Sequence, residues 1–123
     1  MRITSKIFVF QIGCKELDWL TPEDISKNVE NLIDTTVKTQ KINPWNIIIT
    51  GMMYKQQDPK VVKTNKLIEN ICVRKGCKWI QPIMGANLFR DNVHLNDTGL
   101  QAWCGQVDMA VAPLLGWTGC LTN

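Results

Sequence analysis

The sequence is poor in histidine and tyrosine, with one of each, and it has no Cys-x-x-Cys pair. Its five cysteines are odd in number and widely spaced, which fits neither a zinc site nor a complete set of disulfides. They are Cys14, Cys72, Cys77, Cys104 and Cys120. We therefore expect reduced thiols, as in a cytoplasmic protein, and no metal or other cofactor.

Long hydrophobic runs are missing too. No segment approaches the roughly 18 apolar residues that a membrane-spanning helix requires. The apolar run at residues 7–12 is too short for the core of a secretory signal followed by a small-residue cleavage site. We expect neither a transmembrane segment nor a signal peptide.

A dense block of positive charge is also absent. The net charge of +3 arises from 14 basic and 11 acidic residues scattered along the chain, which gives no strong signal for nucleic-acid binding. One segment does lean towards positive charge, and we interpret it as a solvated helix face. Its basic residues are Lys60, Lys63, Lys66, Arg74, Lys75 and Lys78.

What is present is an ordinary globular composition. Hydrophobic residues make up 45% and charged residues 20% of the chain, which argues against a disordered or fibrous protein. A length of 123 residues suits one domain over residues 1–123, and no internal repeat divides it. A second domain is not expected.

Short apolar runs alternate with amphipathic stretches along the chain. The apolar runs are rich in β-branched residues, as in strands buried inside a parallel sheet, and the stretches between them have apolar residues at helical spacing. The expected strands are residues 6–13, 43–53 and 77–83, and the expected helices are residues 21–40, 58–76 and 96–112. This order predicts a three-layer α/β fold, with a parallel sheet of about three strands flanked by helices.

Capping residues mark the expected helix ends. The starts are Thr21 before Pro22, Asp58 before Pro59, and Asn96 or Asp97, whereas Gly76 and Pro113 mark ends. Trp45, Trp79 and Trp103 lie on the expected strands and helices, and we expect them in the core.

Ligands of open parallel sheets bind beyond the carboxyl ends of the strands, which here means residues 13–20, 51–58 and 83–96. The third of these loops contains Asp91 and His94, the only histidine. Histidine moves protons near neutral pH, and a nearby carboxylate holds its ring in one tautomer and stabilises the imidazolium. From the residues alone, the pair is either an acid/base dyad or a polar loop that caps a helix.

The segment FRDNVHLNDTG, residues 89–99, together with the order of elements, resembles the last block of the SGNH or GDSL-type hydrolases, a family of esterases. The resemblance covers about residues 6–112 and is most specific over residues 91–99. It implies a flavodoxin-like fold and a Ser-His-Asp triad, in which Asp91 orients His94 and His94 deprotonates a serine. The second expected helix is also similar to esterase modules encoded by some non-long-terminal-repeat retrotransposons.

Two blocks of that family have no counterpart in this chain. The family's Gly-Asp-Ser nucleophile motif follows its first strand and a glycine oxyanion donor follows its second, whereas this chain begins at what resembles the third. Ser5 precedes the first expected strand and Ser26 lies within the first helix, so neither is placed to meet His94. We expect a truncated or degenerate ester hydrolase domain, inactive on its own. The alternatives are a non-catalytic α/β interaction module and one half of a hydrolase completed by another chain.

The family's third block is changed as well. Its Gly-x-Asn-Asp pattern reads Gly13-Cys14-Lys15-Glu16 here, so Lys15 stands where the resemblance implies an oxyanion-donating asparagine. Loss of one such donor typically costs about 10²–10³ in rate. Cys14 keeps a thiol enzyme open as an alternative, because a cysteine beside a histidine is a nucleophile with its base. Packing as a small residue next to glycine is the other reading of Cys14.

The resemblance also has a consequence for association. In the family's strand order, 2-1-3-4-5, residues 6–12 would become an apolar edge of the sheet, because the strand that normally pairs there is missing. We predict either a homodimer through this edge or a missing N-terminal half supplied by another polypeptide. An ester is the substrate if the protein is active.

Overall fold

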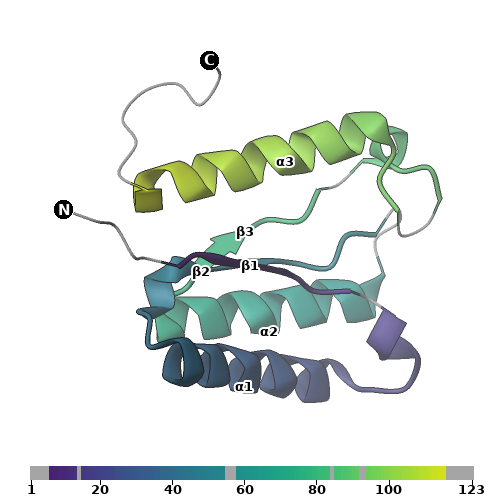
Figure 1. Ribbon diagram of the computed structural model, residues 1–123. Helices are drawn as coiled ribbons and strands as arrows, with labels where there is room; N and C mark the ends of the chain where they lie inside the picture. The colour runs from purple at the N-terminus through teal and green to yellow at the C-terminus, as the bar shows by residue number, and fades with distance from the viewer. Residues whose placement is uncertain (1–5, 14, 55–57, 84, 92–93, 116–123) are drawn as a thin grey trace.

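The computed structural model describes residues 6–13, 15–54, 58–83, 85–91 and 94–115 of the chain. Strands and helices alternate along it, as Figure 1 shows. The strands are β1 (Phe8–Gln11), β2 (Ile47–Thr50) and β3 (Lys78–Ile80), and the helices are α1 (Pro22–Gln40), α2 (Pro59–Lys75) and α3 (Asp97–Val111). All three strands are parallel, in the order β1-β2-β3, so the predicted α/β fold is confirmed.

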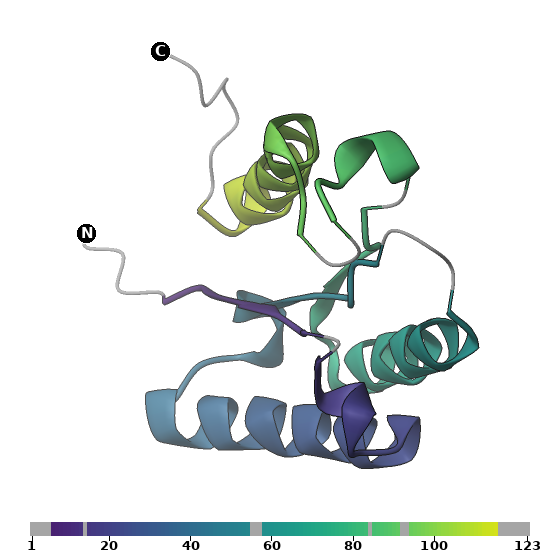
Figure 2. The ribbon, with the colours of Figure 1, turned by 90° about the vertical axis from the view of Figure 1, so that its right-hand side faces the viewer.

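The sheet forms the middle of three layers (Figure 2). Helices α1 and α2 cover one face, and α3 covers the other. Successive side chains of a strand point to opposite faces, and β2 follows this rule. Ile47 and Ile49 join the core formed with α1 and α2, whereas Ile48 joins the smaller core formed with α3. Each face of the central strand is therefore buried, which explains its continuous apolar sequence.

The helix boundaries follow from local chemistry. Thr21 and Asp24 form a reciprocal cap at the start of α1, in which the Thr21 hydroxyl accepts from the Asp24 N–H at 3.1 Å. Asp58 caps α2 by accepting a backbone N–H two residues further on, at 2.7 Å. Gly76 ends α2 in the left-handed conformation, with φ of 83°. These predicted ends are confirmed.

Basic residues of α2 face acidic residues of α1 across an exposed seam between the two helices. The ion pairs are Lys63–Glu23 (2.7 Å), Arg74–Glu30 (3.0 Å), Lys75–Glu30 (3.4 Å) and Lys75–Asp34 (2.9 Å). Exposed pairs of this kind contribute little to stability. The predicted solvated helix face holds for Lys60, Lys63, Lys66 and Arg74, which are exposed on α2. Lys75 is half-buried beside Glu30, and Lys78 lies on β3 and not on the helix.

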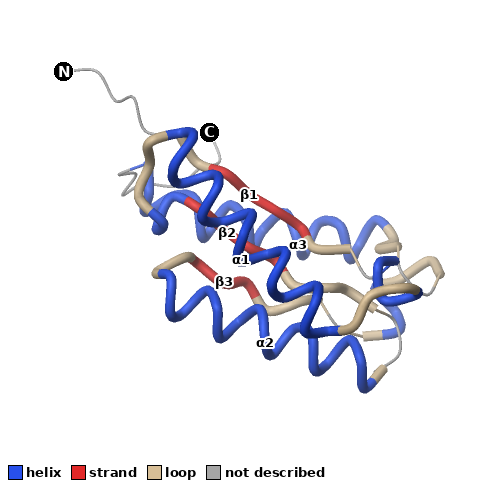
Figure 3. Tube along the Cα trace, turned by 90° about the horizontal axis from the view of Figure 1, so that it is seen from below, coloured by secondary structure: helices blue, strands red, loops and turns tan. Residues whose placement is uncertain are grey.

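Strand β1 forms one edge of the sheet (Figure 3), which confirms the predicted edge. Only β2 pairs with β1 among the described residues. Val9 lies in register with Ile48 and so faces the same side as α3. The core beneath α3 includes Ile48 and Ile80 but not Val9, and Val9 remains 36% exposed. Both the backbone edge of β1 and one of its faces are thus open.

One tryptophan corrects the sequence-based expectation. Trp45 is 57% exposed, because Pro44 begins a short 3-10 turn and the strand starts only at Ile47. Trp45 therefore lies on the turn and not in the core. Trp79 and Trp103 are half-buried and pack against core clusters.

Candidate functional site

Asp91 and His94 lie in a small antiparallel turn between β3 and α3. Figure 1 shows the connection from β3 to α3 at the end of the sheet where the strands finish. The turn is based on a bridge between Phe89 and Leu95. Nearer its tip, the Arg90 N–H donates to the His94 carbonyl at 2.9 Å. Residues 92–93 lie outside the described part. The backbone pairing brings the two arms, and with them Asp91 and His94, together.

The Asp91 carboxylate holds both the ring and the backbone of His94. Its oxygens lie 3.0 and 2.9 Å from Nδ1 of the ring, and Oδ1 also accepts the His94 backbone N–H at 2.8 Å. A carboxylate can only accept, so the proton of the neutral ring belongs on Nδ1, and Nε2 is left as the base. The His94 and Asp91 side chains are 58% and 51% exposed, so a substrate or a second polypeptide can reach them.

Asn96 fastens this turn to the first turn of α3. Its Oδ1 accepts the Gly99 N–H at 2.9 Å, and its Nδ2 donates to the Asn87 carbonyl at 2.7 Å. The Asn96 backbone N–H donates to the Leu88 carbonyl at 2.9 Å. Of the two cap residues that the sequence allows, Asn96 and not Asp97 is the cap.

Gly99 provides a second contact between α3 and the turn. A Cβ at this position would overlap the Leu88 carbonyl oxygen, so the helix and the turn meet at a distance that only glycine permits. Beneath the turn, Met53, Ile83 and Phe89 form a buried apolar cluster. The exposed Asp91 and His94 side chains therefore lie on a turn that packs against a buried apolar cluster.

The other predicted site residues are not joined to this dyad in the described part. Gly13 follows β1 and is exposed, and no hydrogen bond there links it to Asp91 or His94. Lys15 begins a short 3-10 helix, η1 (Lys15–Asp18), but its side chain lies outside the described part, as does Cys14. The oxyanion role of Gly13 and Lys15 and the nucleophile role of Cys14 remain predictions.

Ser26, Cys72 and Cys77 are poor candidates for a nucleophile, whereas Cys104 is exposed on α3 and is not hydrogen-bonded to His94 in the described part. Ser26 is buried in α1 and its hydroxyl donates to a carbonyl of the same helix at 2.9 Å, whereas Ser5 lies outside the described part. Burial raises the pKa of Cys72 to about 12 and that of Cys77 to about 11, so both are protonated at neutral pH. In the described ranges, none of these groups is hydrogen-bonded to His94.

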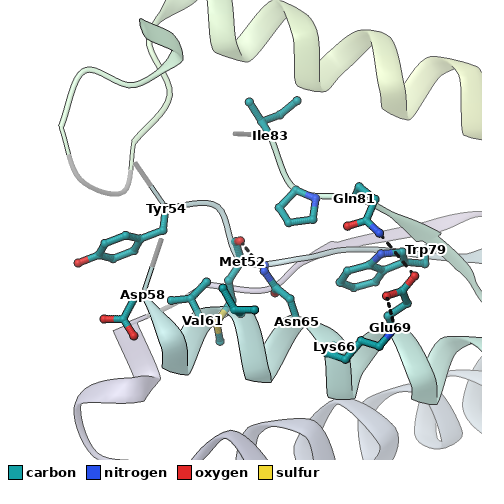
Figure 4. Close-up of a pocket in the computed structure, with 12 residues that line it drawn as sticks. Met52, Tyr54, Asp58, Val61, Asn65, Lys66, Glu69, Trp79, Gln81 and Ile83 are labelled. Atoms are coloured by element: carbon teal, nitrogen blue, oxygen red, sulfur yellow. Dashed lines mark hydrogen bonds and ion pairs between the residues drawn. The ribbon is translucent and has the colours of Figure 1, made fainter. Parts of the chain in front are cut away.

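Sequence reasoning missed a second polar arrangement, at the end of β2. The Asn65 side chain, on α2, pairs with the backbone of Met52: it accepts the N–H at 2.7 Å and donates to the carbonyl at 3.0 Å. Figure 4 shows this pairing at the floor of a pocket of about 210 Å³ between α2 and the segment after β3. An asparagine on a helix carries no local signal for such a distant contact. The pocket lining contains none of the predicted site residues.

Within the described ranges, no group of three or more His, Cys, Asp or Glu side chains is placed to hold a metal ion. None of the helices there combines the length and the apolar character needed to cross a membrane. Comparison with protein-family models gives no match, and no curated protein matches the sequence significantly.

Proposed function

We propose that this chain supplies the acid and base of an SGNH-type ester hydrolase, and that the serine nucleophile comes from another polypeptide segment. The observation that carries the proposal is the placement of the Asp91 carboxylate 2.9 Å from Nδ1 of His94, a side chain that is 58% exposed. A general base needs this arrangement, because the carboxylate orients the ring and stabilises the imidazolium that forms.

In the proposed reaction, Nε2 of His94 accepts the proton of the serine hydroxyl as the serine oxygen bonds to the ester carbonyl carbon. The bond between that carbon and the alcohol oxygen then breaks, and the imidazolium gives its proton to the departing alcohol. Water next attacks the acyl-serine, with Nε2 accepting its proton. The acyl-serine bond then breaks, and the imidazolium gives its proton to the serine oxygen, which releases the acid and restores both the serine hydroxyl and the neutral ring. Asp91 remains ionised throughout.

The open edge of β1 supports a nucleophile that arrives on a separate segment. Carboxyl ends of parallel strands meet at the same end of a sheet. A strand added parallel to β1 would therefore deliver its own terminal loop to the end at which the turn with Asp91 and His94 lies. The described serine, Ser26, is buried on α1 and does not meet this requirement.

The test begins with the nucleic acid that encodes the chain. Translation of the neighbouring coding sequence should reveal a strand that ends in Gly-Asp-Ser. The joined or co-expressed polypeptides should then react with a fluorophosphonate probe at that serine and hydrolyse a short p-nitrophenyl ester. We expect His94→Ala to abolish both reactions, and Asp91→Asn to lower kcat by about 10⁴, as in other triads of this type.

Two controls make the result decisive. The 123-residue chain alone should hydrolyse the ester no faster than free imidazole at the same concentration. A Ser26→Ala variant of the joined protein should keep full reactivity with the probe. Probe labelling of a serine that persists in the His94→Ala variant would refute the proposal.

A second candidate function is that of a non-catalytic interaction module. The observation in its favour is the outer edge of β1, which contains no charged residue and pairs with no other strand in the described part of the chain. A groove of about 240 Å³ lies at the carboxyl end of β1. The groove lining includes Ile12, Leu20 and Leu32, so the surface offered to a partner is largely apolar. An edge without charged residues is not protected against strand addition. In this case a second copy of the chain is the proposed partner, and ester hydrolysis is absent even in the extended protein.

A further inference from the structure

Two backbone hydrogen bonds pair the arms of the turn, on either side of the bridge between Phe89 and Leu95. The Asn96 N–H donates to the Leu88 carbonyl, and the Arg90 N–H donates to the His94 carbonyl. Asp91 is carried on the first arm, and His94 on the second. The distance between the carboxylate and the ring therefore depends on how firmly the two arms are held together.

The Asn96 side chain forms hydrogen bonds both with the first arm of the turn and with helix α3. Its Oδ1 serves α3, by accepting the Gly99 N–H at 2.9 Å. Its Nδ2 serves the turn, by donating to the Asn87 carbonyl at 2.7 Å. The two ends of the amide thus form hydrogen bonds with different elements. Of the two, only Nδ2 binds the arm that carries Asp91.

The hydrogen bonds of Asn96 matter because Asp91 and His94 are exposed to solvent. Water competes for the Asp91 carboxylate and for the His94 ring, since both side chains are more than half exposed. An exposed pair keeps a defined geometry only when its backbone is fixed by neighbouring structure. Asn96 is the polar side chain that links the backbone of the turn to α3 in the described part of the chain.

We infer that Asn96 is a positioning residue for the dyad, which keeps the His94 proton on Nδ1 by fixing the arm that carries Asp91. This role rests on the proposed function, because positioning His94 affects catalysis only if His94 is the general base. The His94 tautomer can be measured on the 123-residue chain without any ester hydrolysis. The positioning role of Asn96 and the proposed function can therefore fail separately.

The test separates the two ends of the amide. Asn96→Ser and Asn96→Asp both keep an oxygen that caps α3, but neither has the Nδ2 donor. We expect helix content and cooperative unfolding to be retained in both variants. The ¹⁵N spectrum of the single histidine should show the Nδ1–H tautomer in the wild-type chain. In both variants we expect the fraction of this tautomer to fall towards that of Asp91→Asn.

Thr21→Ala is the matched control, because it removes the cap of a different helix, α1, and leaves the turn untouched. It should lower stability without changing the His94 tautomer. In the completed enzyme, Asn96→Ser should lower kcat/KM by about tenfold to a hundredfold, the size of effect expected from a displacement of about 1 Å.

The inference is overturned if both folded Asn96 variants keep the wild-type tautomer, or if Thr21→Ala changes it by as much as they do. If Asn96→Ser does not fold, Asn96→Asp alone decides, because its carboxylate is a strong N-terminal cap. A tautomer change without any esterase activity in the extended protein would leave the positioning role intact and refute the proposed function.

Discussion

Oδ1 of Asp91 accepts two hydrogen bonds from a single residue, His94: the backbone N–H at 2.8 Å and the ring Nδ1 at 3.0 Å. The ring is thereby oriented relative to its own backbone and not only relative to the aspartate. A displacement of the backbone in this turn would change the direction of Nε2, the atom that acts on substrate in the proposed function. The stability of the turn is therefore the first property to test.

We predict that Gly99→Ala lowers the free energy of unfolding by about 1–3 kcal/mol, because its Cβ would overlap the Leu88 carbonyl oxygen. Gly105 of the same helix is the control, since a Cβ there meets nothing within 4 Å. Gly105→Ala should raise stability by about 0.5–1 kcal/mol through improved helix propensity. Urea denaturation of the two variants checks both signs. Equal effects of the two substitutions would contradict the contact between α3 and the turn.

The second prediction concerns thiol reactivity. Burial raises the pKa of Cys72 from 9.0 to about 12 and that of Cys77 to about 11. The thiolate is the reactive form. At pH 8, Cys72 therefore has about 1,000-fold less thiolate than an ordinary thiol, and Cys77 has about 100-fold less. Of the three described cysteines, Cys104 is the exposed one and should be alkylated first by iodoacetamide. Peptide mapping after timed exposure to iodoacetamide checks that the rate of labelling falls in the order Cys104, Cys77, Cys72. In denaturant the three cysteines should be labelled at similar rates.

The third prediction is a dependence of stability on pH. The hydrogen bond from Arg74 is the main cause that lowers the pKa of Glu30 below its usual value of 4.5. Ionised Glu30 therefore stabilises the folded state above pH 4.5, and this contribution is lost as the pH falls through the lowered pKa. Glu30→Gln should make the melting temperature fall less steeply on acidification below pH 4.5.

Salt provides an independent check on the same ion pair. At about 1 M NaCl the Debye length is about 3 Å, so wild type and Glu30→Gln should become more alike. Glu16 forms no ion pair among the described residues, and Glu16→Gln serves as the control. An equally steep acid transition in wild type and Glu30→Gln at low salt would count against the assignment.

The fourth prediction addresses the open edge of the sheet. If a second copy adds to β1, the wild-type chain should sediment as a dimer at high micromolar concentration, and Val9→Lys should be a monomer, since a lysine on an edge strand opposes pairing. Val73, which is 75% exposed on α2, supplies the control, and Val73→Lys should remain dimeric. A monomeric wild-type chain would exclude the homodimer.

The parts of the fold that were predictable are those set by neighbouring residues. The caps at Thr21 and Asp58 and the left-handed end at Gly76 depend on a few consecutive residues, and each is where the sequence places it. The run from Ile47 to Ile49 is buried on both faces, as its β-branched composition indicates. Local chemistry was enough for these features because their hydrogen bonds close within one turn or one strand.

The parts that were not predictable depend on contacts between distant residues. The pairing of Asn65 with Met52 joins a helix to a strand end, and the exposure of Trp45 depends on where β2 begins. In the candidate site, the spacing of Asp91 and His94 predicted that they could meet. The second role of Asn96, towards the Asn87 carbonyl, follows only from the way the turn folds back.

The order of the sheet has a consequence for how the chain folds. Phe8 pairs with Ile47 and Ile48 pairs with Lys78, so each pairing closes a loop of roughly 30–40 residues and no local hairpin starts the sheet. Sheets built from such distant pairings form slowly. Until β2 is in place, the apolar segment from Phe8 to Gln11 lacks the one strand with which it pairs in the described part of the chain. During synthesis, we expect this segment to need protection from association with other chains.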